Sequence, residues 1–168
     1  MLRTERLILA PWTEADCAAF TPIATDPEVM RYITGGEPWR ADQIHEFVTR
    51  QVNQFASYGY CMWKLVPVEQ LTDLLVGFCG LQPLPGTAEI EIGWWLARSH
   101  WGRGLATEAA RCVLRDGFER AGLTRIVAIA RPENTRSIRV MEKLGMRFEK
   151  HTVYKGVPVV MYAAAAGR

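Results

Sequence analysis

The order of apolar and polar positions predicts a mixture of strands and helices that does not alternate regularly. Apolar residues at helical spacing predict helices over residues 13–20, 27–32, 41–57 and 105–121, and another after Asn134. Runs of branched and aromatic residues predict strands over residues 6–11, 60–66, 74–81, 88–96, 125–130, 147–154 and 157–163. This order favours an α/β (α+β) fold with a mixed, mostly antiparallel sheet.

Capping signals mark several of the helix ends. Thr13, with Asp16 three positions later, is expected to cap the first helix, and Asn134 is expected to cap the last one. Gly122 and Gly145 each follow a last helical turn and are expected to end the preceding helix. These signals define helix ends within the apolar pattern.

The segment WWLARSHWGRGLATEA, residues 94–109, joins a strand to a helix through two glycines flanked by arginines. The first N–H groups of a helix have no partner inside the helix, and the helix dipole attracts anions there. Glycine lets the backbone approach a ligand, while Arg98 and Arg103 add charge. The segment predicts a phosphate-binding turn, with a purely structural turn as the alternative. Thr107 breaks the dinucleotide pattern G-x-G-x-x-G, and no Lys-Ser/Thr pair completes a P-loop.

Composition narrows the possible classes of protein. The 168 residues predict one domain, residues 1–168. A formal net charge of +2 argues against a nucleic-acid partner. The N-terminal residues lack the long apolar stretch of a secretory signal, and the chain has no run of about 20 apolar residues, so we expect a cytoplasmic protein without a membrane partner.

Cysteine and histidine positions argue against a disulfide framework or a metal site. The four cysteines form no C-x-x-C pair and are expected to be buried free thiols; they are Cys17, Cys61, Cys79 and Cys112. The three histidines are scattered along the chain; they are His45, His100 and His151. No metal is therefore expected.

Four segments, in the same order along the chain, resemble the GNAT superfamily of N-acetyltransferases. EIEIGWWL leading into WGRGLATEA, and then NTRSIRVMEKLGM, are similar to its acyl-CoA-binding core. TERLILAPWTEAD and VMRYITGGEPW are similar to its branch of ribosomal-protein N-terminal acetyltransferases (Rim type). The resemblance spans essentially the whole chain. It implies a GNAT fold with a six- to seven-stranded sheet flanked by about four helices, and acetyl-CoA as the cosubstrate.

The same resemblance implies a set of coenzyme-binding residues. Leu96 and Ala97 would pair with the pantetheine arm. The pyrophosphate loop and the first helical turn after it would consist of Ser99, Gly102, Arg103, Gly104, Leu105 and Ala106. Ser99 departs from the family pattern, which has Gln or Arg at that position. Asn134 would contact the coenzyme as well as capping its helix, although capping alone would explain it. Arg139, on the expected exposed face of the same helix, is a candidate for the ribose 3′-phosphate, with plain solvation as the alternative.

Transfer of an acyl group from a thioester to an amine needs a base for the ammonium, donors for the oxyanion and a proton for the thiolate. Glu89 and Glu91 lie on one face of a strand. The resemblance implies that Glu91 is the base, acting through water; a solvated strand position is the alternative, and we favour it for Glu89. The tyrosine that many relatives use for the thiolate is replaced by Met141. The resemblance implies Ser137 instead, although Ser137 could simply belong to the first helical turn.

Two aromatic residues are candidates for the acceptor side. Tyr32 and Trp39 flank the segment TGGEP, which suits a lid and predicts substrate binding. Other tryptophans, namely Trp12, Trp63 and Trp94, are expected in the core. We predict acetyl transfer to a primary amine, on a protein N-terminus or a small molecule, by direct attack in a ternary complex. A catalytically silent acyl-CoA sensor is the alternative, and the sequence leaves open whether the chain forms a homodimer.

Overall fold

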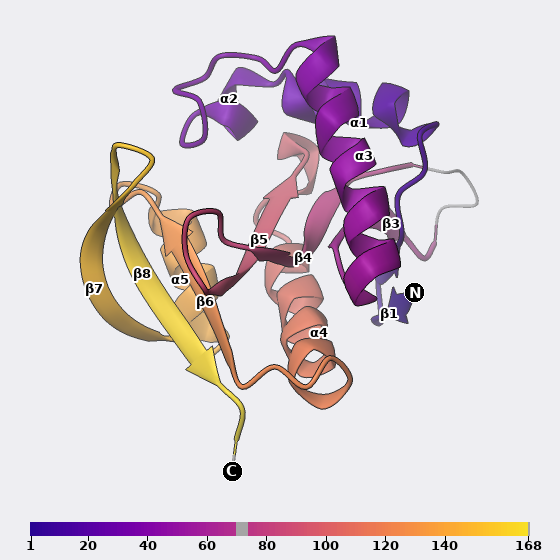
Figure 1. Ribbon diagram of the computed structural model, residues 1–168. Coiled ribbons are helices and arrows are strands. Elements are labelled where there is room, and N and C mark those ends of the chain that lie inside the picture. The colour runs from indigo at the N-terminus through magenta and orange to yellow at the C-terminus, as the bar shows by residue number, and fades with distance from the viewer. Residues whose placement is uncertain (70–73, 168) are drawn as a thin grey trace.

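The computed structural model describes residues 1–69 and 74–167, which form a mixed sheet of eight strands with helices on both faces (Figure 1). The strands, in chain order, are β1 Leu2–Arg3, β2 Leu7–Ala10, β3 Met62–Pro67, β4 Gly77–Pro83, β5 Ile90–Leu96, β6 Arg125–Ala130, β7 Arg147–Tyr154 and β8 Val157–Ala165. Their order in the sheet is β1-β2-β3-β4-β5-β6-β8-β7. All neighbours pair antiparallel except β5 and β6, which run parallel. The predicted fold class is confirmed. The sheet has one strand more than predicted because the two residues of β1 are too few to form a visible pattern.

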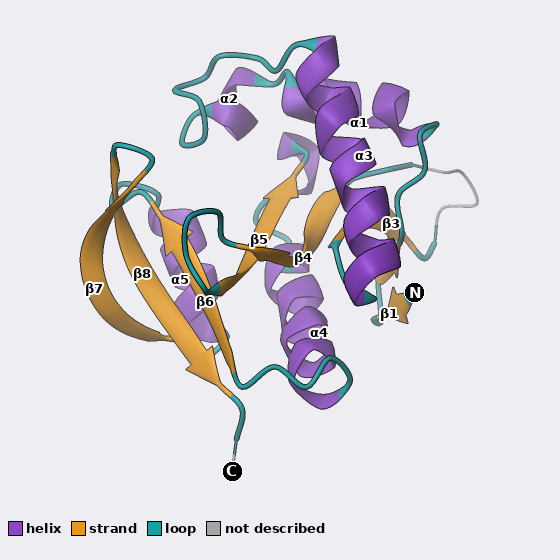
Figure 2. Ribbon diagram, in the orientation of Figure 1, coloured by secondary structure: helices purple, strands orange, loops and turns teal. Residues whose placement is uncertain are grey.

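Five α-helices and one 3₁₀ turn occur among the described residues (Figure 2). They are α1 Asp16–Ala24, α2 Pro27–Met30, α3 Ala41–Tyr58, the 3₁₀ turn η1 Arg98–His100, α4 Leu105–Glu119 and α5 Thr135–Lys143. Residues of α3 pack on one face of the sheet with α1 beside them, whereas α4 packs on the other face, against β4 and β5. None of the helices in the described part of the chain is long and apolar enough to cross a bilayer.

The predicted cap of the first helix is wrong. Helix α1 begins at Asp16 with Ala15 as its N-cap, and it continues past Phe20 to Ala24. The Thr13 carbonyl accepts the Asp16 N–H at 3.0 Å, but its hydroxyl does not cap the helix; the Thr13 N–H and hydroxyl both donate to Oδ2 of Asp16, at 2.6 and 2.9 Å. The Thr13–Asp16 pair therefore fixes a turn before the helix rather than its first residue. Asn134 does cap α5, accepting the Ser137 N–H at 3.2 Å, as predicted.

The main core lies between the sheet and the pair α1 and α3, where aromatic rings pack together. The ring centroids of Phe47 and Phe78 are 5.1 Å apart, and those of Phe20 and Phe47 are 5.3 Å apart. Trp12 and Trp63 are buried, as predicted. Cys61 and Cys79 are buried free thiols, whereas Cys17 and Cys112 are only half-buried, contrary to the expectation for all four. Burial raises the pKa of Cys61 to about 12, which keeps that thiol protonated.

Strands β5 and β6 separate along their length, and this divergence positions the site. Their only paired residues among those described are Glu91 and Val127, whereas β5 pairs with β4 along its whole length, from Ile90 to Leu96. Figure 1 shows the two strands spreading apart beyond the pair. Beyond Ile92, whose backbone belongs to this bridge, the edge of β5 faces a gap in the sheet up to its end at Leu96.

Candidate functional site

The free edge of β5 presents backbone groups to this gap. The Leu81 N–H donates to the Cys61 carbonyl at 3.1 Å and so faces β3. Alternate residues of an antiparallel strand turn their backbone groups toward opposite neighbours, so Ile92, the partner of Leu81, faces away from β4. By the same alternation Trp94 and Leu96 also face the gap. The strand therefore offers N–H groups to a molecule inserted beside it.

The loop after β5 ends in a helix start without a side-chain cap. Gly102 and Gly104 adopt left-handed backbone angles, with φ of 72° and 77°, which other residues rarely adopt. Gly104 is the N-cap of α4, and within residues 1–69 and 74–167 no side chain caps the helix there. Gly102, Arg103 and Gly104 are exposed, whereas Leu105 is buried and anchors the first turn. Uncapped N–H groups at an exposed helix start form a site for an anion.

An arginine from the N-terminal part of the chain holds this loop. Nη1 of Arg6 donates to the Arg103 carbonyl at 2.9 Å, and Nη2 of Arg6 lies 2.6 Å from Oε2 of Glu108 in α4. Burial alone would raise the pKa of Glu108, but hydrogen bonds from Thr4 and Arg6 and the charge of Arg6 outweigh it and lower that pKa. Glu108 thus ties α4 to the N-terminal residues.

Trp101 joins the end of β5 to the beginning of α5. Its Nε1 donates to the Leu96 carbonyl at 2.8 Å, and the guanidinium carbon of Arg136 lies 4.7 Å from the centroid of its ring. Ser137 follows Arg136 in the first turn of α5 and is half-buried. The predicted loop residues and the predicted Ser137 are thereby brought to the same end of the sheet. Arg139 is exposed in the middle of the same helix, α5.

Glu91 lies on β5 at the point where β6 separates from it. Nε2 of Gln82, its partner on β4, donates to Oε2 of Glu91 at 3.1 Å. Burial raises the pKa of Glu91 to about 7, although the Gln82 hydrogen bond and the charge of Lys155 act in the opposite direction. The carboxyl group can therefore gain or lose a proton near neutral pH. Glu89 differs, because it forms an ion pair with Arg125 at 3.0 Å.

A groove with a volume of about 1130 Å³ contains Glu91. Its walls come from α3, from β4 and β5, and from the turn between β7 and β8. Aromatic side chains line much of it, including Trp39, Phe47, Phe78, Trp94, Trp95 and Tyr154. Trp94, expected in the core, is half-buried: it packs against the main core and also lines this groove. An apolar cleft with a few polar groups is the usual form of a small-molecule or peptide site.

The two predicted acceptor residues do not lie together. Trp39 lines the groove, and its ring centroid is 4.8 Å from that of Trp95. Tyr32 is not among the residues that line the groove. Its backbone carbonyl accepts a hydrogen bond of 3.2 Å from Nε of Arg131, which follows β6. Its neighbour Ile33 is the residue that lines the groove. The lid segment therefore contributes one side of the groove through Ile33 and Trp39.

A second, smaller cavity of about 410 Å³ lies beside the end of β5. Ala97, Arg98 and Ser99 line it on one side, and residues of α1 and the α1–α2 turn line it on the other. Nε of Arg98 lies 3.7 Å from Oδ2 of Asp26, so its charge is directed to this turn and not, as predicted, to the glycine amides. The Ser99 hydroxyl lies 3.0 Å from Nδ1 of His100.

Sequence reasoning missed the residues that surround Glu91. Gln82 reaches Glu91 through the pairing of β4 with β5, and Lys155 reaches it through the distant hairpin of β7 and β8. No short sequence motif connects these residues. One usable signal was the turn Lys155-Gly156, where Lys155 has a φ of 49°. The predicted strands over residues 147–154 and 157–163 imply a turn there but not its position over the groove.

Comparison with known proteins agrees with this fold. The family model described as "Acetyltransferase (GNAT) domain" matches residues 6–147. The uncharacterized protein YkkB of Bacillus subtilis is 34% identical over 96% of this chain and 93% of its own length. The uncharacterized N-acetyltransferase YnaD of the same organism is 32% identical over 92% of this chain and 89% of its own. The crystal structure of a GNAT-family acetyltransferase from Bacillus anthracis is similar with a TM-score of 0.82 and 28% identity, covering 98% of this chain and 97% of that one.

Proposed function

Because this chain belongs to the GNAT acetyltransferase family and is an N-acetyltransferase, we propose that it moves the acetyl group of acetyl-CoA directly to a primary amine held in the groove beside Glu91. The observation that carries this proposal is the position of one carboxyl group, with a pKa of about 7, between the groove and the gap in the sheet. The acceptor enters from one side and the thioester from the other. Glu91 lies where they meet.

The gap and the loop after β5 suit the two ends of the donor. The pyrophosphate would accept hydrogen bonds from the uncapped N–H groups at the start of α4, between Gly102 and Ala106. The pantetheine arm would extend along the free edge of β5 toward Leu96 and Ala97. Asn134 and Arg139, on the neighbouring α5, would contact the rest of the coenzyme. This assignment uses backbone donors for most contacts, which agrees with Ser99 replacing the usual Gln or Arg.

The transfer itself needs three groups of this chain. Glu91 would accept a proton from the acceptor ammonium through a water molecule, and the free amine would then attack the thioester carbonyl carbon. The Leu96 N–H would donate to the oxyanion. The C–S bond then breaks, the nitrogen loses its second proton, and the Ser137 hydroxyl would donate a proton to the departing thiolate and regain one from the nitrogen. Amide product and free coenzyme A result, with the proton passing from Glu91 to solvent.

The pKa of Glu91 bears on the choice of acceptor. An α-amino group has an ordinary pKa near 8, whereas that of a lysine side chain is about 10.4. A base with a pKa of about 7 removes a proton far more readily from an α-ammonium group than from a lysine ammonium group. We therefore infer an α-amine, on a peptide N-terminus or a small molecule of similar basicity. The resemblance of the N-terminal segments to the Rim-type branch supports the same choice.

A screen for thiol release tests this function. Peptides with free N-termini, the same peptides with blocked N-termini and an internal lysine, and small amines are each incubated with acetyl-CoA, and free coenzyme A is measured. We expect turnover with at least one α-amine and little with the blocked peptides. Equal turnover of the blocked peptides, whose amine is the lysine side chain, would contradict an α-amine as the acceptor. Coenzyme binding without turnover on any amine would contradict the catalytic assignment.

A further inference from the structure

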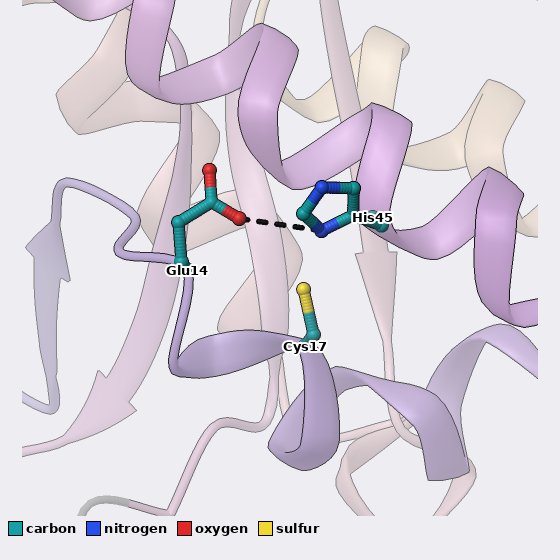
Figure 3. A group of neighbouring side chains, drawn as sticks. All are labelled: Glu14, Cys17 and His45. Atoms are coloured by element: carbon teal, nitrogen blue, oxygen red, sulfur yellow. Dashed lines mark ion pairs between the residues drawn. The ribbon is translucent and has the colours of Figure 1, made fainter.

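Three side chains that can bind metal ions gather where α1 approaches α3 (Figure 3). Glu14 precedes α1, Cys17 lies in its first turn, and His45 lies near the start of α3. Their ligand atoms all lie within 4.8 Å of one another. Figure 3 shows the sulfur of Cys17 directed toward the space between the other two side chains. No sequence motif marks this group, because 28 positions separate Cys17 from His45.

The distances in this group suit a zinc ion. Nδ1 of His45 lies 3.3 Å from Oε2 of Glu14. Zn²⁺ binds nitrogen and oxygen at about 2.0–2.2 Å, so two such ligands at a tetrahedral angle are about 3.4 Å apart. Cys17 must approach by a small side-chain movement, which the half-buried position allows. A set of one thiolate, one imidazole and one carboxylate binds Zn²⁺ in preference to Mg²⁺ or Ca²⁺.

A hydrogen bond from outside the group orients one ligand. The Thr49 hydroxyl, one helical turn after His45, donates to Oε1 of Glu14 at 3.0 Å. This bond leaves Oε2 of Glu14 facing His45. Partners of this kind fix the orientation of ligands in many metal sites. The other end of the group is fixed by the turn before α1, where Asp16 accepts from Thr13 and from Lys64.

We propose that Glu14, Cys17 and His45 form a Zn²⁺ site, with water as the fourth ligand, that joins the start of α1 to the start of α3. When the ion binds, the Cys17 thiol releases its proton to solvent and its sulfur bonds to the metal. His45 and Thr49 also line the groove, so the ion is bound at its rim and fixes the position of α3 there. The site is independent of the acetyl-transfer residues on β5 and α5.

Titration with Co²⁺ and Zn²⁺ tests the site on the full chain, after treatment with a chelator and under reducing conditions. We expect Co²⁺ to produce a thiolate-to-metal absorption band at one equivalent, and Zn²⁺ to abolish it by displacement. Zn²⁺ should also raise the midpoint of thermal unfolding, because it binds only the folded chain. Absence of the band, or of any rise in the midpoint with Zn²⁺, would overturn the proposal.

Matched variants identify the ligands. Cys17→Ser should remove the Co²⁺ band, and Thr49→Val should weaken Zn²⁺ binding about tenfold by releasing Glu14. Cys112→Ser and His151→Gln alter a half-buried thiol and an exposed imidazole elsewhere, and both should keep the band and the affinity. Circular dichroism of each metal-free variant verifies that it is folded. A band lost in Cys112→Ser but kept in Cys17→Ser would assign the metal to another thiol and overturn the site.

Discussion

Gln82 and Glu91 face each other across the β4–β5 pair, and the Gln82 side chain donates a hydrogen bond of 3.1 Å to the Glu91 carboxylate. Such a bond stabilises the charged form, whereas burial stabilises the neutral form and has the larger effect. The outcome is a pKa of about 7. A general base is most effective when its pKa lies near the working pH.

The pH profile of Glu91→Gln is the first prediction. In the native chain, kcat/KM should rise with pH as Glu91 loses its proton, with a limb near pH 7. Glu91→Gln should lower kcat/KM by about 10²-fold or more and remove this limb, leaving the titration of the acceptor amine. Gln82→Leu should retain the limb but move it upward by about one pH unit. A variant Glu91→Gln with an unchanged profile would remove Glu91 from the mechanism.

The stability of the same variant is the second prediction. The folded-state pKa of Glu91 lies above the ordinary value of 4.5, so the folded chain holds this proton more tightly than the unfolded chain. Its free energy of unfolding therefore falls as the pH rises from about 4.5 to about 7. Glu91→Gln cannot ionise, so it should exceed the native chain in stability by about 1–3 kcal/mol at pH 8, and by little at about pH 5. Urea unfolding at both pH values measures the difference; equal stability at both would contradict it.

Most of the fold could be predicted from periodicity, because strands and long helices leave a pattern several residues long. Helix α3 and the segment after Asn134 are examples, since their apolar positions recur at helical spacing. Strand β1 could not be predicted, because two residues carry no pattern. The start of α1 was misplaced because Asp16 bonds to Thr13 instead of completing a cap, which depends on side-chain geometry.

The site could be predicted only where it is continuous in sequence. Residues 96–106 run without interruption from the end of β5 to the first turn of α4, so the glycines and the helix start appear together as a motif. Gln82, Lys155 and Trp39 reach Glu91 or its groove through strand register, a distant hairpin and a loop. These contacts are set by tertiary packing, and a single sequence contains no spacing that reports them. Trp101 lies within the motif, but its contact with Arg136 depends on how α5 packs and could not be predicted from the sequence.

Trp101 gives the third prediction, on coenzyme binding. Trp101→Phe loses the donor to the Leu96 carbonyl but keeps a ring beside Arg136. One such hydrogen bond contributes about 1 kcal/mol, so the KM for acetyl-CoA should rise about fivefold. Arg136→Gln, which loses only the cation–π contact, should have a smaller effect, of about two- to fivefold. Steady-state kinetics measure both, and an unchanged KM in Trp101→Phe would show that the bond from Trp101 to the Leu96 carbonyl does not position the segment proposed to bind the coenzyme.

The glycine at the start of α4 gives the fourth prediction. Gly104 has a φ of 77°, so Gly104→Ala should cost about 1 kcal/mol of stability by backbone strain. An added Cβ has room, with Nη2 of Arg6 the nearest atom at 3.6 Å, so the strain acts on the loop and its N–H groups. Gly122→Ala is the matched control, because Gly122 has a φ of 67° and open space around it. Both variants should lose similar stability, but calorimetry should find weaker coenzyme A binding only in Gly104→Ala. Equal affinities in the two variants would contradict the pyrophosphate assignment.

The fifth prediction concerns Glu108, which links α4 to the N-terminal residues. Its carboxylate accepts hydrogen bonds from the Thr4 hydroxyl at 2.6 Å and from the Arg6 N–H at 2.9 Å, and it pairs with the Arg6 guanidinium. The pKa of Glu108 is lowered, so the folded chain favours the charged form; the resulting stability is present above the ordinary pKa of 4.5 and is lost as the pH falls below it. Glu108→Gln should therefore cost about 1–2 kcal/mol at neutral pH and progressively less in acid. Glu28→Gln, whose partner Arg31 lies 3.9 Å away on the surface, should change stability by less than about 0.5 kcal/mol. Urea unfolding across this range measures both, and a cost for Glu108→Gln that did not shrink in acid would show that the carboxylate charge contributes nothing to this link.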